Sequence, residues 1–215
     1  MALEETQRQA QRGRPRSLTE EGIVKAALKL TASSHLEDVS MRALAQELGV
    51  PVMTIYSYVP NREAFYELVT DHVLRTVAVP GPSEGSWEER LLQLERDARA
   101  AMRKYPGVKF NRRGGISPEA ARLTNGVLSI LEDAGFGRAE ARLAFASLFT
   151  LMVGQIEIDS YDESAASTAV IESVTQTTND SSDVAFEFAL NAVIEGLKIL
   201  LNPKPPAKSS RRRSR

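Results

Sequence analysis

The 215-residue sequence contains no cysteine and only two histidines. Without cysteine it can form neither a disulfide framework nor a thiolate metal site, and a cysteine nucleophile is excluded. His35 and His72 are 37 residues apart, which is not a spacing that places two ligands on one helix face. We therefore expect neither a metal nor a cofactor in this chain.

Long apolar runs are also missing. The longest uncharged, strongly apolar stretch, Leu143 to Ile156, has 14 residues, whereas a helix needs about 20 to span a bilayer. The first twenty residues lack the apolar segment of a secretory signal peptide. The sequence therefore predicts a cytoplasmic protein with no membrane partner, in which Leu143 to Ile156 forms a buried helix.

The net charge of −1 is unevenly distributed along the chain. The stretch from Arg8 to Arg16 carries four arginines and no acid, and the tail from Pro203 to Arg215 carries six basic residues. Leu143 to Leu197 contains nine acids and no lysine or arginine, so this part would repel a polyanion. Any DNA contact is therefore expected near the N-terminus, although both basic ends also fit solvated, flexible termini.

Apolar residues recur at intervals of three and four from Ser17 to Asn202, and no alternating run of β-branched residues interrupts them. This periodicity predicts an all-α protein. Thr19, Ser40 and Asn61 are typical N-cap residues, and Gly49 is typical of a helix end. The predicted helices lie over about 19–34, 40–49, 51–59, 61–77, 87–105, 117–134, 138–159 and 183–201.

Proline and glycine gather in Val79-Pro80-Gly81-Pro82-Ser83-Glu84-Gly85, which is the clearest break in the helical pattern. We expect a basic, flexible arm over 1–16, a first domain over 17–79, a second domain over 80–202 and a basic, disordered tail over 203–215. The segment from Ser160 to Ser182 is rich in serine, threonine and aspartate. It fits either a mobile connection or a short helix over about 166–175.

Two short predicted helices joined by a tight Gly49-Val50 turn occupy only the twenty residues from Ser40 to Val59. A helix-turn-helix unit has this geometry, and the N-terminal part of its second helix enters the major groove of DNA. Any helical protein contains such hairpins, so the hairpin by itself only weakly favours DNA binding.

The run from Arg14 to Leu74 resembles the DNA-binding domain of the tetracycline-repressor (TetR) family of bacterial regulators. The resemblance lies in TEEGIVKAA from Thr19, VSMRALAQELGV from Val39, TIYSYV from Thr54 and NRE from Asn61. The second half resembles the family's ligand-binding domain more loosely. The resemblance implies an N-terminal three-helix helix-turn-helix domain followed by a helical ligand-binding and dimerisation domain.

The chemistry of individual side chains suggests DNA contacts in the first domain. Arg42, in the first turn of its helix, can form a bidentate contact with guanine. Pro51, Val52 and Met53 offer no side-chain hydrogen bonds and depart from better known relatives, and Met53 also fits a core position. Ile55 and Tyr56 are expected in the core, and the hydroxyl of Tyr56 could also contact the DNA backbone. The candidate DNA-binding residues are Arg14, Arg16, Ser40, Arg42, Val52, Met53, Thr54, Ser57, Tyr58 and Arg62.

The resemblance also implies a small-molecule effector that lowers the affinity for DNA. Aromatic, sulfur-containing and polar residues of the second domain are candidates for a pocket, with core packing as the alternative for each. The candidates are Arg99, Met102, Tyr105, Phe110, Asn125, Phe145, Phe149, Met152 and Gln155. We find no phosphate-binding glycine loop, nucleophile elbow or paired carboxylates in the sequence, and therefore do not expect an enzyme.

The last predicted helix, around Phe186 to Leu201, is apolar over much of its circumference. One domain cannot easily cover such a surface, so this helix and Leu143 to Ile156 favour a homodimer, with an internal helix of a monomer as the alternative. The sequence thus predicts a regulator, most simply a repressor, that a small molecule releases from a pseudopalindromic, double-stranded operator. The alternatives are a helical adaptor or an enzyme that keeps the helix-turn-helix head without recognising an operator.

Overall fold

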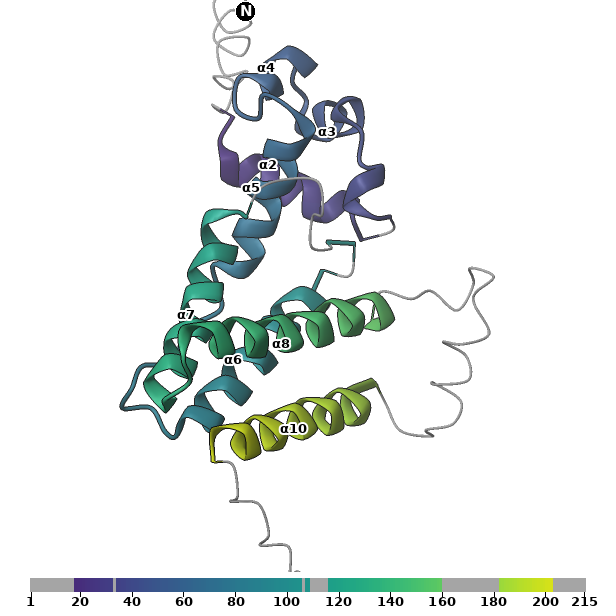
Figure 1. Ribbon diagram of the computed structural model, residues 1–215. Helices are drawn as coiled ribbons and strands as arrows, with labels where there is room; N and C mark the ends of the chain where they lie inside the picture. Colours follow the sequence, from purple (N-terminus) through teal and green to yellow (C-terminus); the bar gives the residue numbers. More distant parts are fainter. Residues whose placement is uncertain (1–17, 33, 106, 109–115, 160–181, 203–215) are drawn as a thin grey trace, which may run out of the picture.

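The computed structural model describes residues 18–32, 34–105, 107–108, 116–159 and 182–202. All regular secondary structure within these residues is helical, as the apolar periodicity predicts. The molecule has a small head, one long connecting helix and a larger helical body (Figure 1). The head contains α2 (Glu20–Leu30), the 3-10 helix η1 (Leu36–Asp38), α3 (Met41–Leu48) and α4 (Val52–Tyr56). Helix α5 (Arg62–Leu74) connects the head to the body. The body contains α6 (Trp87–Arg103), α7 (Pro118–Ala134), α8 (Arg138–Asp159) and α10 (Ser182–Leu201).

Polar caps set the helix boundaries of the head. The Ser40 side-chain oxygen accepts a hydrogen bond from the backbone N–H of Ala43 at 3.1 Å and begins α3. Gly49 ends the same helix with a φ of 66°, in the left-handed region that favours glycine. Thr19 and Asn61 cap α2 and α5 in the same way as Ser40. The caps predicted from the sequence are therefore confirmed.

Two helices are shorter than their sequence patterns predict. α4 ends at Tyr56 rather than near residue 59, since the chain turns after it and buries Val59 under the head. α5 ends at Leu74 rather than near residue 77. The guanidinium of Arg122 donates hydrogen bonds to the carbonyl oxygens of Leu74 (3.3 Å) and Val77 (2.8 Å), and so satisfies acceptors that a longer helix would use.

The head contacts the body at a second place besides α5. The backbone N–H of Leu36 donates a hydrogen bond to the carbonyl oxygen of Gly107, at 2.7 Å. A Cβ atom on residue 107 would lie 2.4 Å from the carbonyl oxygen of Ser34 and 2.8 Å from Cβ of Thr31. Only glycine allows the segment that follows α6 to approach the head this closely.

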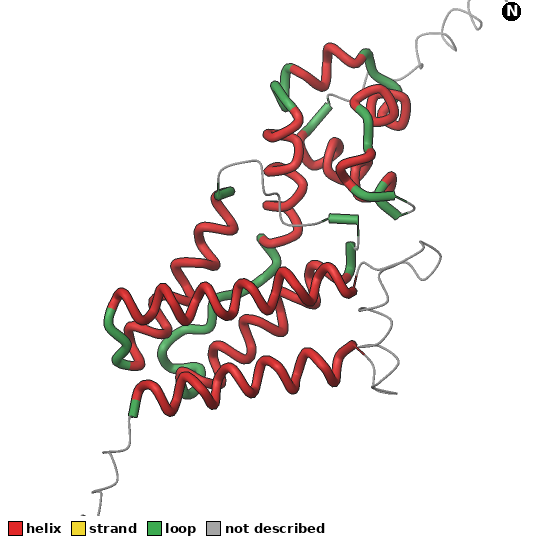
Figure 2. The backbone as a smooth tube through the Cα atoms, turned by 45° about the vertical axis from the view of Figure 1, so that its right-hand side comes forward, coloured by secondary structure: helices red, strands yellow, loops and turns green. Residues whose placement is uncertain are grey.

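The body is built around α8, which packs against α6, α7 and α10. Figures 1 and 2 show α8 and α10 side by side along most of their length. α8 buries one face, at positions such as Ala144, Leu148 and Met152, and exposes Leu143 on the opposite face. Within a single chain the prediction of a buried helix over Leu143 to Ile156 is confirmed for the inner face only, and the expected burial of the outer face against a second subunit stays a prediction.

α8 is also the one helix of the described ranges that is long and apolar enough, by length and composition, to cross a membrane. A third of its most apolar window is buried against the other body helices. The neighbouring helix α10 also exposes apolar side chains, at Val184, Phe188 and Ile199. Two neighbouring helices of the body thus expose large apolar side chains, which is typical of a surface that contacts another molecule.

Candidate DNA-binding surface and ligand pocket

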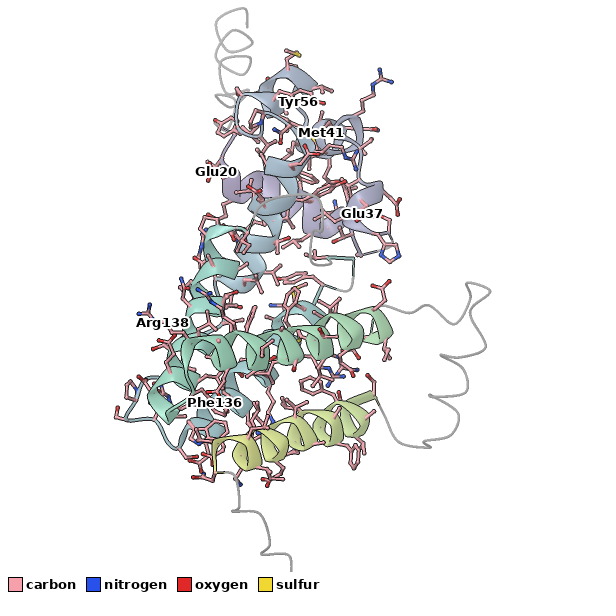
Figure 3. All side chains as sticks on the ribbon, viewed as in Figure 1. Glu20, Glu37, Met41, Tyr56, Phe136 and Arg138 are labelled. Carbon is pink, nitrogen blue, oxygen red and sulfur yellow. The ribbon has the colours of Figure 1, made fainter. Side chains whose placement is uncertain are left out.

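The end of the head formed by α4 presents the candidate DNA-reading side chains. Figure 3 shows Tyr56 at this end of the molecule, with Phe136 and Arg138 toward the other end. Met53 is 77% exposed, so it does not fill the core. Tyr56 is 39% exposed, and its prediction as a core residue is wrong, since it lies three residues from Met53 on the outer face of a helix. Ile55 is fully buried, as predicted.

Arg42 differs from the other cations of the head in having no partner. Lys25 pairs with Glu21 at 2.6 Å, and Lys29 pairs with Glu47 at 2.6 Å. The exposed guanidinium of Arg42 makes no hydrogen bond or ion pair with any described residue. It is available to an external acceptor from the first turn of α3, the helix that packs against α4.

Several other candidates already donate within the chain. The hydroxyl of Tyr58 donates to the carbonyl oxygen of Leu18 at 2.6 Å, and that of Ser57 donates to the carbonyl of Thr54 at 2.7 Å. The guanidinium of Arg62 donates to the hydroxyl of Tyr66 and to the carbonyl of Glu37. Tyr58 and Ser57 would have to exchange partners before donating to a phosphate, whereas Arg62 keeps the N–H groups of Nη1 for an external acceptor.

The remaining DNA candidates fall into three groups. The Ser40 oxygen accepts a backbone N–H and keeps its own hydrogen for an external acceptor. Val52 and Thr54 are half-buried on α4. Arg14 and Arg16 lie outside the described residues, as do the arm and tail predicted over 1–16 and 203–215 and most of the segment from Ser160 to Ser182.

A cavity of about 330 Å³ lies in the body next to α5. Phe145, Phe149 and Met152 of α8 line it, as candidates from the sequence, and the rings of Phe145 and Phe149 stack with centroids 5.8 Å apart. Its volume falls within the range of small-molecule sites. The full lining is Glu67, Thr70, Leu74, Leu94, Glu95, Ala98, Ile116, Ser117, Ala120, Leu123, Thr124, Val127, Phe145, Phe149 and Met152.

Arg99 and Gln155 do not line this cavity, because both side chains bind the carboxylate of Asp159. Arg99 Nε donates to Asp159 Oδ2 at 2.8 Å, and the side chains of both residues are only 6% exposed. Gln155 Nε2 donates to Oγ of Ser182 at 2.6 Å and to Asp159 Oδ1 at 3.1 Å. Burial opposes ionisation of Asp159, but the hydrogen bonds from Arg99, Ser182 and Gln155 hold its pKa below the usual range. This cluster joins the end of α8 to the start of α10.

Three further predicted ligand residues, Met102, Tyr105 and Asn125, do not line the cavity either. Met102 is buried in the core, and Tyr105 follows the end of α6. Asn125 is exposed on α7, because neighbouring positions such as Thr124 and Val127 take the face that lines the cavity. Phe110 lies outside the described residues.

Sequence reasoning missed the polar groups that do line the cavity. Glu95 is only 8% exposed and makes no hydrogen bond or ion pair with any described residue, so burial raises its pKa from 4.5 to about 7. The buried hydroxyl of Thr70 also has no hydrogen-bond partner among the described residues. A signal was present for Glu95, since it interrupts the apolar stripe of Leu91, Leu94 and Ala98 on α6.

We expect Glu95→Gln to stabilise the protein at pH 8 and to have little effect at pH 5. The folded chain holds the Glu95 proton more tightly than the unfolded chain does. The wild type therefore loses stability as the pH rises from 4.5 to about 7, whereas the glutamine variant does not. The raised pKa limits the expected gain in the free energy of unfolding at pH 8 to about 3 kcal/mol. Urea unfolding at both pH values measures the difference between variant and wild type. Glu132→Gln, at an exposed position of α7, is the control, and a pH-independent difference for Glu95→Gln would contradict the assignment.

The comparisons with known proteins agree with this architecture. Residues 79–169 match a family model described as "Tetracyclin repressor-like, C-terminal domain". The HTH-type transcriptional repressor DrrR1 of Streptomyces coeruleorubidus is 30% identical over 166 residues, which are 76% of this chain and 62% of DrrR1. This chain therefore spans somewhat less than two thirds of that relative's length. The tetracycline repressor protein class E of Escherichia coli is 28% identical over 200 residues, covering 87% of this chain and 94% of that protein.

A solved structure extends the similarity to the whole fold. ActR, a TetR family protein of Streptomyces coelicolor crystallised with (S)-DNPA, is 26% identical with a TM-score of 0.69, over 85% of this chain and 98% of ActR. The match includes the N-terminal head and the body that follows it, which is the domain order expected from the sequence. The chain is therefore similar to transcriptional regulators of the TetR family in sequence, in the order of its helices and in fold.

Proposed function

We propose that this chain is a ligand-responsive repressor that binds a pseudopalindromic operator as a homodimer and leaves it when a small molecule fills the body cavity. One observation carries the proposal. α5 begins directly after α4 at the DNA-reading end, and its other end lines the cavity through Glu67, Thr70 and Leu74. The same rigid helix therefore touches both sites.

The arrangement of α5 supplies the coupling between ligand and operator. A ligand in the cavity favours the position of α5 that fits it best, and α5 carries α4 with it. If this position differs from the one that fits DNA, ligand weakens operator binding, and operator weakens ligand binding by the same factor. ActR in complex with (S)-DNPA and with actinorhodin is a related protein that binds small molecules in its crystal structures, which supports an effector here.

The homodimer is proposed from the exposed apolar face of α8 and α10. Phe188 of α10 is 78% exposed in a single chain, and Leu143 of α8 is 71% exposed. A second copy placed on this face would cover it and bring two heads together. Half-sites in the major groove lie about 34–36 Å apart, so two heads held at a fixed separation read a pseudopalindrome.

Location and catalysis follow from the same proposal. A regulator that binds chromosomal DNA works in the cytoplasm, and the apolar face of α8 is assigned here to a second subunit rather than to a membrane. TetR-type regulators are non-enzymatic, so we propose no catalytic activity for this chain. The adaptor and enzyme alternatives are set aside because the relatives are repressors.

The purified chain is expected to enrich a small set of genomic fragments, from which its operator is defined. Arg42→Ala should then weaken operator binding by about 1–3 kcal/mol and relax the preference at one base pair per half-site, because a free guanidinium is lost from the reading end. Lys25→Ala is the matched control: it removes the same charge from the head, but from a lysine paired with Glu21.

Sequencing of selected operator variants measures both effects. A chain that enriches no fragment would contradict the repressor proposal itself. An Arg42→Ala protein that retains the wild-type preference at every base pair would contradict only the assignment of Arg42 to a base contact.

A further inference from the structure

The body cavity also indicates the chemical class of its ligand. We infer that it takes an organic cation, a protonated amine on an aromatic body, whose ammonium group binds Glu95 and Thr70. The inference rests on the proposed function, because it specifies the effector of the same site. It is argued from three properties of the lining: its charge, its unpartnered polar groups and its apolar surface.

The charge of the lining is entirely negative among the described residues. Glu67 of α5 and Glu95 of α6 line the cavity, and no lysine, arginine or histidine of the described chain does. Glu95 is nearly buried without any partner in the described chain. An ionised carboxylate in such a place requires a counter-charge, which a bound cation supplies and an anionic ligand would oppose.

The Thr70 hydroxyl is a second, independent observation from another helix. Its oxygen is buried and has no hydrogen-bond partner in the described structure, although nearly all buried polar groups in proteins have one. Thr70 lies three residues after Glu67 on the same face of α5. An ammonium group has several N–H donors, so it can bind the Glu95 carboxylate and the Thr70 oxygen together.

The rest of the lining fits an aromatic body. The stacked rings of Phe145 and Phe149 and the thioether of Met152 come from α8, whereas both polar groups come from α5 and α6. Flat rings pack well on phenyl rings and methionine sulfur. The polar and aromatic parts of the ligand are therefore expected to lie toward different helices, with the amine next to α5 and α6.

Three small probes with the same ring system test the inference on the full chain without DNA. They are 2-(2-naphthyl)ethylamine, which is a cation at pH 8, the neutral 2-(2-naphthyl)ethanol and the anion 2-naphthylacetate. Isothermal titration at pH 8 is expected to give at least tenfold tighter binding of the amine than of the alcohol, and the weakest binding for the acetate. Equal or tighter binding of the alcohol or the acetate, or no binding of the amine, would overturn the inference.

The Glu95→Gln variant assigns the preference to one side chain. It should bind the amine and the alcohol with similar affinity and bind the alcohol as the wild type does, whereas Glu132→Gln should retain the wild-type preference. Affinity for the amine should also rise about tenfold from pH 6 to pH 8 in the wild type, as Glu95 loses its proton, and stay constant in Glu95→Gln. A Glu95→Gln protein that still prefers the amine, or a wild-type affinity that does not rise with pH, would contradict the role of Glu95.

The outcome is separable from that of the proposed function, because operator binding is measured in a different experiment. A chain that binds its operator but shows no preference for the amine refutes the cation site alone. A chain that prefers the amine but binds no genomic fragment supports the cation site and refutes the repressor.

Discussion

Replacing Ala192 by arginine is expected to yield a folded monomer whose operator affinity is lower by about 10²–10⁴-fold. Ala192 is exposed on α10, on the outer face that also presents Val184 and Phe188. In a single chain the new guanidinium points into solvent and costs the fold little. In the proposed dimer it would be buried without a partner, and loss of the second head removes the gain that comes from binding two linked half-sites.

Sedimentation velocity and operator titration measure these two effects, and circular dichroism checks that the variant is folded. Ser129→Arg is the matched control, since it adds the same charge at an exposed position of α7, away from the α8 and α10 face. An Ala192→Arg protein that remains dimeric would place the interface elsewhere. A wild type that is monomeric at micromolar concentration would refute the dimer and the requirement for two half-sites.

Arg99→Met is expected to lower the free energy of unfolding by about 3–5 kcal/mol, because removal of one partner leaves a buried charge. Asp159 would keep only the polar hydrogen bonds of Gln155 and Ser182 and the distant guanidinium of Arg103, whose Nε lies 3.9 Å away. The ring of Phe186 would also lose the guanidinium that lies 4.5 Å from its centroid. The start of α10 thereby loses its buried ionic contact with α6, whereas the more exposed pairs Arg103–Asp183 and Arg96–Glu187 remain.

Arg96→Met provides a control one turn away on the same helix. Arg96 forms a bidentate pair with Glu187 of α10, at 2.7 and 2.6 Å, but both side chains are largely accessible to water. Exposed pairs of this kind contribute about 0.2–1 kcal/mol, so this variant should unfold almost as the wild type does. Urea denaturation at pH 7 compares the two, and equal losses for Arg99→Met and Arg96→Met would show that burial does not decide the effect.

Local signals in the sequence predicted most of the fold. Ser40, Gly49 and Asn61 set helix boundaries through bonds to backbone groups within three or four residues, and such bonds can be read from neighbouring letters. The ends of α4 and α5 were predicted less well. Arg122 satisfies the carbonyls at the end of α5 from 48 residues away, and no local pattern reveals this contact.

The candidate sites were predicted unevenly for the same reason. Arg99 looked like a ligand contact because its partners, Asp159 and Asp183, are 60 and 84 residues distant in sequence. Tyr56 looked like a core residue because an aromatic on a short helix is usually buried, yet only Ile55 faces inward on α4. Glu95 could have been found, since a carboxylate inside an apolar stripe has no reason to be there for packing alone.

The hydrogen bond between Leu36 and Gly107 determines how the head can move. A domain that is attached through a single helix can rotate in every direction. A domain that is attached at two separated points rotates mainly about the line that joins them. Here the two points are α5 and the segment after α6, so we expect the head to rotate most easily about the line between them. Both attachments originate in helices that line the cavity, since α5 carries Thr70 and α6 carries Glu95. A ligand between these helices therefore acts on the axis of rotation itself, and a bulkier residue at position 107 would shift that axis without touching either the ligand or the DNA.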